Sequence, residues 1–373
     1  MKIGIDTHAA EQDGTGNCSY IRGLVSALTA LDGDDEYVLY ALDPHHRFYA
    51  ALEPRAKLVV RRLRPRHPVV RIPVVLAAAS YRDRIDVLHV QYVGPRHHRG
   101  ARVVTIHDLA FLRIPESFPR SQRWRLRWQV RANARRAAAI ITGSEYSRRD
   151  IQAAYAIPPE RIWVIHDAPD PRFRPAAAGG AVRERLGIRH PYVLYVGRLN
   201  PRKNVLALVR AFERVRPQLG EPAQLVIAGQ EDGQADRLDA AIAASPWRAN
   251  IIRAGYVSDT ELPALHAGAA AFVYLSAFEG FGLPPLEAMA CGVPVISSDA
   301  GALREVLGDA ALLVPPGAVE ETATALLRVL GEPDLRAALV RKGLQRAAQF
   351  SWRTAAEQTR EVYRRALEAV SRS

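Results

Sequence analysis

The segment Tyr192-Val-Leu-Tyr-Val196, followed by Gly197-Arg-Leu-Asn-Pro-Arg-Lys-Asn204, decides the fold class of this chain. Its first five residues are apolar, aromatic or β-branched and predict a buried strand. A loop follows, and a helical pattern then runs to about Val215. A strand that passes through a loop into a helix is the repeating unit of a parallel α/β sheet.

The same alternation of apolar runs and helical patterns occurs in both halves of the chain. It predicts two parallel sheets of about six strands each, hence two doubly wound, Rossmann-like domains. In the first half the expected strands are Lys2 to Asp6, Tyr37 to Ala41, Val87 to Val90, Val103 to Ile106, Ile140 to Thr142 and Ile162 to Ile165. In the second half they are Tyr192 to Val196, Leu225 to Ala228, Asn250 to Arg253, Ala271 to Leu275, Val293 to Ser297 and Ala311 to Val314.

The length of 373 residues also favours two domains, because single cores rarely grow beyond about 250 to 300 residues. Proline and glycine are frequent from Asp167 to Gly180, and they prevent a helix or a β-strand from continuing through this stretch. We therefore expect domains at 1–167 and 191–350 with a linker at 168–190. The final helix, within 351–373, could cross back to the first domain.

Composition places the chain among ordinary folded proteins, with 48% hydrophobic and 24% charged residues. No signal peptide and no apolar run long enough for a membrane span is recognisable, so we expect a cytoplasmic protein, with peripheral binding to the inner face of the plasma membrane as an option. Cys18 and Cys291 lack the spacing of a disulfide framework or a thiolate metal site, and no metal is expected.

The net charge of +12 is concentrated in one region. Between Arg55 and Arg149 there are 22 Lys and Arg residues against five acids, so the rest of the chain is slightly acidic. A basic region of this kind suits anionic lipid, a phosphorylated acceptor or nucleic acid. Of these we expect a membrane surface or an acceptor, and no nucleic acid.

The loop Gly197–Asn204 is the first candidate site. Ligands of open α/β sheets bind beyond the carboxyl ends of the strands, where a helix N-terminus also offers free N–H groups. Arg198 and Lys203 add two cations there, which suit a diphosphate and can stabilise it as a leaving group without a metal. The alternative is a pair of solvated loop cations.

The second candidate is Phe278-Glu-Gly-Phe-Gly-Leu-Pro-Pro-Leu-Glu-Ala-Met289, which follows the strand expected at Ala271 to Leu275. Gly280 and Gly282 permit a tight turn before a helix that should begin near Pro285. Glu279 would then lie at the mouth of the loop and Glu287 in the first helical turn. Each carboxylate could hold a vicinal diol of a sugar or ribose, or else be a surface acid and a helix-dipole partner.

Two weaker candidates lie in the first half. His107 and Asp108 follow the strand expected at Val103 to Ile106, and no nucleophile elbow accompanies them, which disfavours a hydrolase. The loop with Gly14 and Gly16 could cover the binding cleft, although it lacks both the dinucleotide and the P-loop spacing.

The helix expected from Arg120 to Arg136 is strongly basic. At 100° per residue one arc is apolar, and it holds Leu126, Val130, Ala137 and Ile141. A second arc joins aromatic and basic residues, and it holds Trp124, Arg127, Trp128, Arg131 and Arg135. The second arc suits an anionic membrane, unless the tryptophans pack under a neighbouring element.

Taken together, these segments resemble the retaining glycosyltransferases of family 4, which have the GT-B fold of two Rossmann-like lobes facing a central cleft. The resemblance covers most of the chain. It rests on the stretches Gly197 to Asn204, Ala254 to Asp259, Phe278 to Met289 with its two spaced glutamates, Gly292 to Ser297 and Gly301 to Val306.

The resemblance implies roles for individual residues. Arg198 and Lys203 would grip the donor diphosphate, Glu279 would touch the transferred sugar, Glu287 the ribose, and His107 the sugar from the N-terminal lobe. Further donor contacts are implied for Gly197, Val257, Gly280, Phe281, Gly282 and Leu283. The anomeric configuration would be retained without a metal, with the leaving phosphate as base.

The stretch His107 to Pro119 looks like the mannosyltransferase branch that builds polysaccharides, so GDP-mannose is the expected donor and a saccharide or lipid-linked precursor the expected acceptor. The first loop departs from the family pattern, because Cys18 stands where related sequences often have glycine. Two alternatives stay open: an epimerase or phosphorylase of the same fold, and a non-catalytic polyanion-binding protein. A monomer or homodimer is expected.

Overall fold

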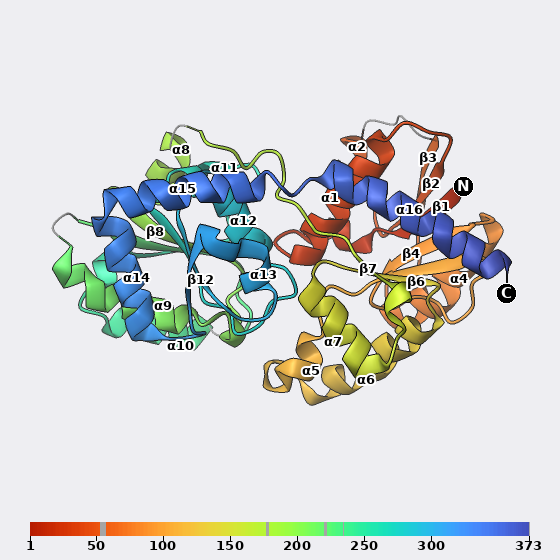
Figure 1. Cartoon of the computed structure of the whole chain (residues 1–373), viewed down its shortest axis with the longest axis horizontal. Helices are drawn as coiled ribbons and strands as arrows, with labels where there is room; N and C mark the ends of the chain where they lie inside the picture. The colour runs from red at the N-terminus through yellow and green to blue at the C-terminus, as the bar shows by residue number, and fades with distance from the viewer. Residues whose placement is uncertain (53–56, 177–178, 220–221, 234, 373) are drawn as a thin grey trace. The chain divides into compact units, whose positions relative to one another are not determined.

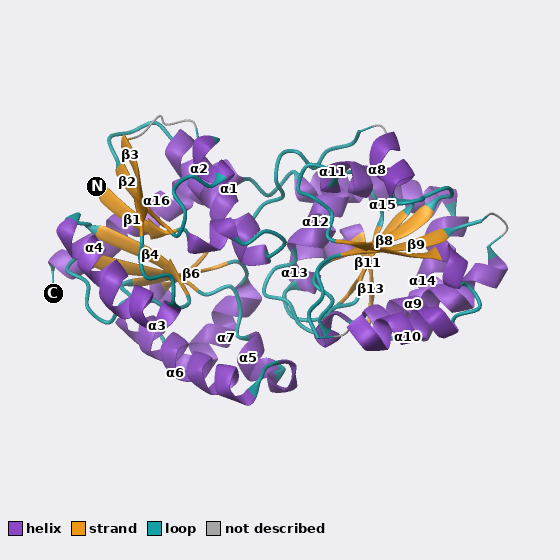
Figure 2. Cartoon of the chain, turned by 180° about the vertical axis from the view of Figure 1, so that it is seen from behind, coloured by secondary structure: helices purple, strands orange, loops and turns teal. Residues whose placement is uncertain are grey.

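The computed structural model describes residues 1–52, 57–176, 179–219, 222–233 and 235–372. The chain divides into two compact units, Met1–Asp167 together with Ser351–Ser373, and Ala168–Phe350. Each unit is a parallel sheet with helices on both faces (Figures 1 and 2). The predicted fold class, two doubly wound Rossmann-like domains, is confirmed.

The sheet of the first unit has seven strands in the order β3-β2-β1-β4-β5-β6-β7. Its strands are β1 (Lys2–Asp6), β2 (Glu36–Ala41), β3 (Lys57–Arg62), β4 (Val87–Gln91), β5 (Ala101–Thr105), β6 (Ala139–Thr142) and β7 (Ile162–Val164). Every pairing is parallel, and β1 pairs with both β2 and β4. The strand order therefore changes direction between β1 and β4, the position where doubly wound sheets bind ligands.

Helices cover both faces of this sheet (Figure 2). They are α1 (Gly16–Ala30), α2 (Arg47–Ala50), α3 (Pro68–Val70), a π-helical turn (Arg71–Leu76), α4 (Ala77–Arg82), α5 (Ala110–Arg113), α6 (Arg120–Arg136), α7 (Glu145–Tyr155) and α16 (Trp352–Ser371). Alternate strand residues such as Val38, Leu88 and Val104 form one core with Val130 of α6 and Ile151 of α7.

The C-terminal helix α16 packs against α1 and the middle of this sheet. Gly23 of α1 makes the contact possible, because an added Cβ there would lie 2.1 Å from Trp352 Cε2. Tyr363 is fully buried, and its hydroxyl lies 2.6 Å from Nδ1 of His89 on β4. The last helix thus completes the first unit although it follows the second in sequence.

The sheet of the second unit has six strands in the order β10-β9-β8-β11-β12-β13. They are β8 (Tyr192–Val196), β9 (Gln224–Ala228), β10 (Ile251–Gly255), β11 (Ala271–Tyr274), β12 (Val295–Ser298) and β13 (Ala311–Val314). Here the order changes direction between β8 and β11, which are neighbours. All six expected strands are present within a few residues of the predicted bounds.

Two helical layers enclose this second sheet (Figure 2). The helices are α8 (Gly180–Arg185), α9 (Val205–Val215), α10 (Ala235–Ala244), α11 (Leu262–Ala267), α12 (Leu283–Ala290), α13 (Leu303–Leu307), α14 (Val319–Gly331) and α15 (Pro333–Ala347). Helix α9 packs on α14 beneath one face, and α12 packs on α15 over the other.

Several local expectations were wrong. Strand β3 was not predicted, because its sequence KLVVRR carries exposed cations that suit an edge strand but mask the apolar run. Helix α1 begins at Gly16, inside the stretch that was expected to be a loop, and α12 begins at Leu283 rather than near Pro285. Ile141 lies on β6 and does not extend the apolar stripe of α6. The segment 168–190 contains α8 and groups with the second unit.

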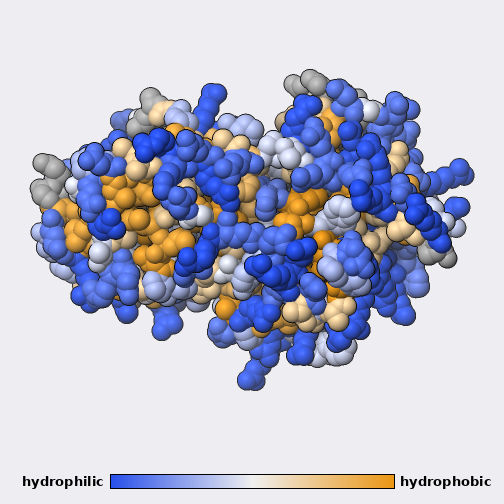
Figure 3. Space-filling model, viewed as in Figure 1, coloured by the Kyte–Doolittle hydropathy of each residue, from blue (hydrophilic) through white to orange (hydrophobic). Residues whose placement is uncertain are grey.

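On the face drawn in Figure 3 the surface is mainly hydrophilic, with apolar side chains between the polar ones. None of the helices in the described ranges is both long and apolar enough to cross a bilayer.

Candidate active site

The loops after β8 and β11 meet at the carboxyl edge of the second sheet. Since β8 and β11 are adjacent and the strand order changes direction between them, both loops enter the crevice that such sheets use for ligands. The loop after β8 begins at Gly197, whose N–H donates to Ala228 O at 3.0 Å. Asn204 ends this loop and donates from Nδ2 to Leu275 O at 2.9 Å, which ties the two loops together.

A buried ion pair joins these loops. Lys203 and Glu279 are 7% and 9% exposed, and Lys203 Nζ donates to Glu279 Oε1 and, at 2.6 Å, to Tyr274 Oη. Tyr274 in turn donates to the same Glu279 oxygen at 3.1 Å. Burial alone would raise the pKa of Glu279, but the cations of Lys203 and Arg202 outweigh it and lower the pKa from 4.5 to about 2.

Sequence reasoning predicted Lys203 and Glu279 but missed two of their partners. Arg202 donates from Nη1 to Phe278 O at 2.8 Å and lies 3.7 Å from Glu279 Oε1. Tyr274 is the last residue of β11, so its place beside the loop follows from the strand end alone. Arg202 could have been predicted from its position next to Lys203 in the same motif.

Arg198, the other predicted cation, lies apart from this pair. Its side chain is 45% exposed, and its Nε is 3.5 Å from Asp232 Oδ2. Val257, a predicted donor contact, follows β10 and is 5% exposed. Among the described residues, no hydrogen bond or ion pair joins Arg198 to Glu279 or Glu287.

The turn from Gly280 to Leu283 is held by close backbone packing. Gly282 has φ of +110°, and an added Cβ would lie 2.5 Å from Leu303 Cδ2. Gly301 has φ of +61°, and its Cβ would lie 2.3 Å from Glu279 O, which accepts a hydrogen bond from Ala302 N–H at 2.9 Å. Only glycine allows this approach, so the loop after β12 fixes the backbone of Glu279.

Phe281 and Leu283 anchor the same turn in the core. Both are less than a tenth exposed, and the Phe281 ring packs edge-on against Phe350 with centroids 5.7 Å apart. The turn that carries Gly280 is therefore fixed on both sides before α12 begins.

Glu287 lies in the second turn of α12, not the first, and only 8% of it is exposed. Burial raises the pKa of its carboxyl from 4.5 to about 8, the nearby Asp170 and Asp259 add to the rise, and Arg172 opposes it. Arg172 is itself engaged, because it donates to both Asp170 oxygens at 2.9 Å and to Asp259 O at 3.1 Å. Within the described residues the Glu287 carboxyl forms no hydrogen bond.

In the first unit, His107 follows β5 and is half-buried. Its Nε2 lies 2.8 Å from Gln91 Oε1, an acceptor, so Nε2 carries the proton. The rings of Tyr20 and Tyr92 pack edge-on against it at 4.5 and 5.7 Å. Burial lowers the pKa of His107 to about 4, and the imidazole is neutral at physiological pH. Asp108, its neighbour, accepts from Ala110 N–H at 2.9 Å at the start of α5.

A buried hydrogen-bonded chain supports this histidine. It runs from Tyr363 of α16 through His89 to Thr105, which contacts the Tyr20 hydroxyl at 2.8 Å. Burial, with a smaller contribution from His107, lowers the pKa of His89 to about 3. The chain was not predicted, because its members come from α16, β4, β5 and α1.

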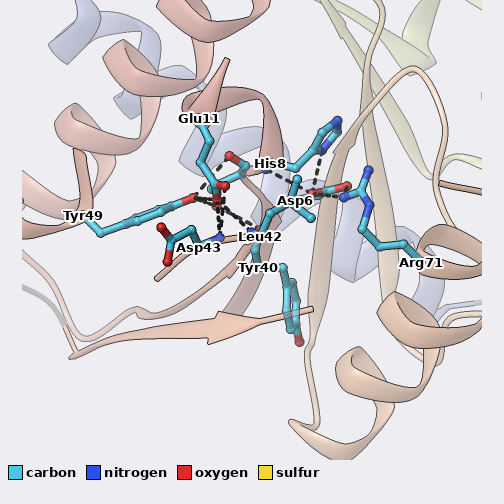
Figure 4. Close-up of polar contacts among 9 residues, drawn as sticks. Asp6, His8, Glu11, Tyr40, Leu42, Asp43, Tyr49 and Arg71 are labelled. Carbon is cyan, nitrogen blue, oxygen red and sulfur yellow. Dashed lines mark hydrogen bonds and ion pairs between the residues drawn. The ribbon is translucent and has the colours of Figure 1, made fainter. Parts of the chain in front are cut away.

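A second polar cluster lies where β1 ends beside β4 (Figure 4). Arg71 is 2% exposed, and its Nη1 donates to Asp6 Oδ1 at 3.2 Å; His8 Nδ1 lies 2.9 Å from the same oxygen. Burial raises the pKa of Asp6, but His8 and Arg71 outweigh it and lower the pKa to about 2. Glu11 accepts from the N–H groups of Leu42 and Asp43 at 2.7 and 3.0 Å. Sequence reasoning missed this cluster because Arg71 is distant in sequence.

The loop with Gly14 and Gly16 leads directly into α1. Thr15 is the N-cap, with its hydroxyl accepting from Cys18 N–H at 3.2 Å, and Gly16 is the first helical residue. Cys18 is buried, with Sγ 3.6 Å from Ala10 O. Gly16 therefore begins a helix that packs against the turn His8–Glu11.

Helix α6 carries its tryptophans outward. Trp124 and Trp128 are 67% and 55% exposed with ring centroids 6.3 Å apart, and Arg127 and Arg131 are also exposed. Val130 is fully buried and Leu126 partly so, as the apolar arc predicts.

Over the described ranges, no group of three or more His, Cys, Asp or Glu side chains is arranged to hold a metal ion.

Two parallel sheets, each with helices on both faces, define a protein of the two-domain Rossmann-like, GT-B class. Residues 182–346 match the family Glycosyl transferases group 1, and residues 19–173 match Glycosyltransferase Family 4. O-antigen chain mannosyltransferase B of Escherichia coli is 32% identical over 327 residues, which cover 86% of this chain and 83% of that protein. The chain therefore belongs to glycosyltransferase family 4, and the resemblance seen in its motifs is confirmed.

Solved structures agree with this fold. Sucrose-phosphate synthase from Thermosynechococcus elongatus superposes with a TM-score of 0.80 at 22% identity, covering 100% of this chain and 99% of that one. Anabaena HepE in complex with UDP and glucose superposes with a TM-score of 0.75 at 21% identity, covering 97% and 98%. At these identities the likeness shows the fold alone.

Proposed function

We propose that this glycosyltransferase moves a sugar from a nucleotide-diphosphate sugar, GDP-mannose in our hypothesis, to a saccharide, lipid-linked or polysaccharide-precursor acceptor with retention of anomeric configuration. The observation that carries the proposal is the pairing of Lys203 with Glu279 at the carboxyl edge between β8 and β11, with the buried Glu287 on the helix that follows the same loop. The 32% identical relative is a mannosyltransferase, which supports mannose as the transferred sugar. The UDP in the HepE complex supports a nucleotide donor without indicating which base it carries.

The cations of this site support a role in holding the diphosphate. Lys203 and Arg202 lie within reach of one carboxylate, and Arg198 is on the same loop. A diphosphate near Lys203 would replace Glu279 as its counter-ion, which frees that carboxylate to accept hydrogen bonds from sugar hydroxyls. As the bond to the sugar breaks, the same cations would stabilise the negative charge on the leaving diphosphate without a metal.

The buried Glu287 supports recognition of the ribose. Its carboxyl has no hydrogen-bond partner among the described residues and a pKa raised by burial and by neighbouring acids, so it is largely protonated near neutral pH. A vicinal diol supplies two donors, which would stabilise the ionised carboxylate. For His107, the family resemblance implies a contact with the transferred sugar, and a neutral imidazole suits such a hydrogen bond.

The donor is tested with a panel of GDP-, UDP- and dTDP-sugars, followed by calorimetry and by donor hydrolysis. We expect GDP-mannose to bind at least about 10-fold more tightly than UDP-glucose, and a preference for UDP-glucose would overturn the mannose assignment. An NMR assignment of the anomeric proton in the product tests retention. Conversion of the donor without any acceptor would favour the epimerase alternative instead.

Peripheral membrane binding is a second proposal, carried by the exposed tryptophans and arginines of α6. Such a face suits an anionic lipid surface. Binding to anionic vesicles should weaken with salt and with Trp124→Ala plus Trp128→Ala, while Trp247→Ala in the second unit serves as a control. Unchanged vesicle binding in the double variant would refute this role.

A further inference from the structure

A basic cavity lies in the first unit, away from the carboxyl edge of the sheet. Its volume is about 260 Å³, and it is lined by Arg96, His97, His98, Gly100, Arg102, Arg136, Ala138 and Val370. Gly100 and Ala138 directly precede β5 and β6, so the cavity adjoins the amino ends of these strands. His107 follows the opposite end of β5, about 17 Å away at about 3.3 Å per residue. The cavity is therefore separate from the site proposed for the donor.

Arg102 is the buried cation of this cavity. Only 6% of the residue is exposed, and its Nη2 donates to Arg96 O at 3.2 Å. Its Nε and Nη1 are buried and have no hydrogen-bond partner within the described residues. An unsatisfied buried donor is unfavourable, and more so when it is charged, so these N–H groups need an acceptor that the described residues do not supply.

His98 presents a second unpaired group. Ser80 Oγ donates to Ala77 O at 2.9 Å, so it accepts from Nδ1 of His98 at 3.3 Å. Nε2 of His98 is then left without a proton, and it is buried without a partner among the described residues. Burial, and then the charge of Arg102, lower the pKa of His98 to about 4. A ligand that carries a hydroxyl proton would satisfy Nε2.

The charge around the cavity has one sign. Burial, and then repulsion from Arg136, lower the pKa of Arg102, so the two guanidinium groups interact. No acidic residue lines the cavity, and in the described chain Arg96, Arg102 and Arg136 form no ion pair. Cations brought together without a carboxylate are the arrangement that proteins use for phosphate groups.

We propose that this cavity is a phosphate-binding site, in which Arg102 donates from Nε and Nη1, His98 Nε2 accepts from a phosphate hydroxyl, and Arg96 and Arg136 neutralise the remaining charge. A phosphomonoester fits these needs below its second pKa of about 6, where it keeps one hydroxyl, so the titrations below are made at about pH 5.5. The proposal is independent of the donor assignment.

The test uses the full chain, inorganic phosphate and glycerol 3-phosphate as probes, and ³¹P NMR titration at constant ionic strength. Because Lys203 could also bind phosphate, each variant is measured with and without Lys203→Ala. The pocket variant is Arg96→Gln plus Arg136→Gln, which changes exposed side chains and leaves the core intact. The matched control is Arg99→Gln plus Arg125→Gln, which removes the same charge from exposed positions of the same loop and helix, outside both the cavity lining and the arc that carries Trp124 and Trp128.

We expect phosphate binding that survives Lys203→Ala, weakens at least about 10-fold in the pocket variant and changes less than about 2-fold in the control. Arg102→Met, checked for a native thermal transition, should abolish it. Equal weakening in pocket variant and control would overturn the proposal, as would the failure of both soluble phosphates and phosphate-bearing vesicles to bind in the Lys203→Ala background.

The source of the phosphate is resolved by a parallel experiment with phosphatidylcholine vesicles that contain phosphatidic acid. If soluble phosphates bind in the pocket-dependent manner, the ligand is a free phosphate compound. If soluble phosphates fail but vesicle binding is lost selectively in the pocket variant, the ligand is a lipid phosphate headgroup. Failure of both arms refutes the site.

Discussion

Glu279 and Glu287 lie eight positions apart in one turn and helix, are nearly equally buried, and have opposite electrostatic surroundings. Glu279 faces Lys203 and Arg202, which lower its pKa to about 2, whereas Glu287 faces Asp170 and Asp259, and burial raises its pKa to about 8. The first is a paired anion and the second is largely a neutral acid at pH 7. The difference teaches that burial alone does not assign a charge state; the nearest charges decide it.

Removing the cation of the Glu279 pair should have the largest effect. Lys203→Ala leaves a buried carboxylate without its main partner, and we expect about 3 to 5 kcal/mol of lost stability and about 100-fold or more lost turnover. Chemical denaturation and a sugar-transfer assay measure the two effects. Lys342→Ala removes a surface cation paired with Asp309 and should change stability by less than about 1 kcal/mol.

The double variant Lys203→Met plus Glu279→Leu separates stability from activity. Replacing both charges with apolar groups avoids the unpaired carboxylate, so stability should recover most of the loss while activity stays low. If the double variant is as unstable as Lys203→Ala, the ion pair is not the reason for the loss.

The next test displaces the backbone of Glu279 and leaves its charge unchanged. Gly301→Ala should be destabilising by more than the roughly 1 to 2 kcal/mol of left-handed strain, because its Cβ would meet Glu279 O. It should also reduce turnover about 10-fold. Gly187→Ala is the control, with φ of +69° and open space around the added Cβ. Equal effects in both variants would show that contact with Glu279 O is unimportant.

The contrast between the two acids also predicts a pH dependence of stability. A folded pKa of about 8 means that the contribution of Glu287 is fully present below its unfolded value of 4.5 and is lost as the pH rises through 8. Glu279, with a folded pKa of about 2, contributes above 4.5 and loses that contribution as the pH falls toward 2. Thermal melts from pH 5 to 9 should therefore fall less steeply in Glu287→Gln than in the native chain. Parallel curves would contradict the raised pKa.

A smaller effect is expected in proton linkage. If a diol ionises Glu287, donor binding at pH 7 should release up to one proton, measurable by calorimetry in buffers of different ionisation enthalpy. Glu287→Gln should remove this release, and its persistence in that variant would assign the proton to another group.

The features that depend on the order of strands and helices along the chain could be predicted from the sequence. Parallel sheets and the strand-end loops with Lys203 and Glu279 follow from the alternation of strands and helices, because carboxyl ends of parallel strands share one edge. The opposite pKa values did not follow, since Asp170, Arg172 and Asp259 reach Glu287 only through folding. Asp6 with Arg71, and the chain from Tyr363 to Tyr20, were missed for the same reason. Strand β3 was hidden by its cations.

The central claim is that the two glutamates hold different parts of one donor. Calorimetric titration of GDP and GDP-mannose into the native chain, Glu279→Gln and Glu287→Gln tests it most directly. The account predicts that Glu287→Gln weakens both ligands alike, whereas Glu279→Gln weakens GDP-mannose and leaves GDP unchanged or tighter. Equal weakening of both ligands by both variants, or no weakening by either, would contradict it.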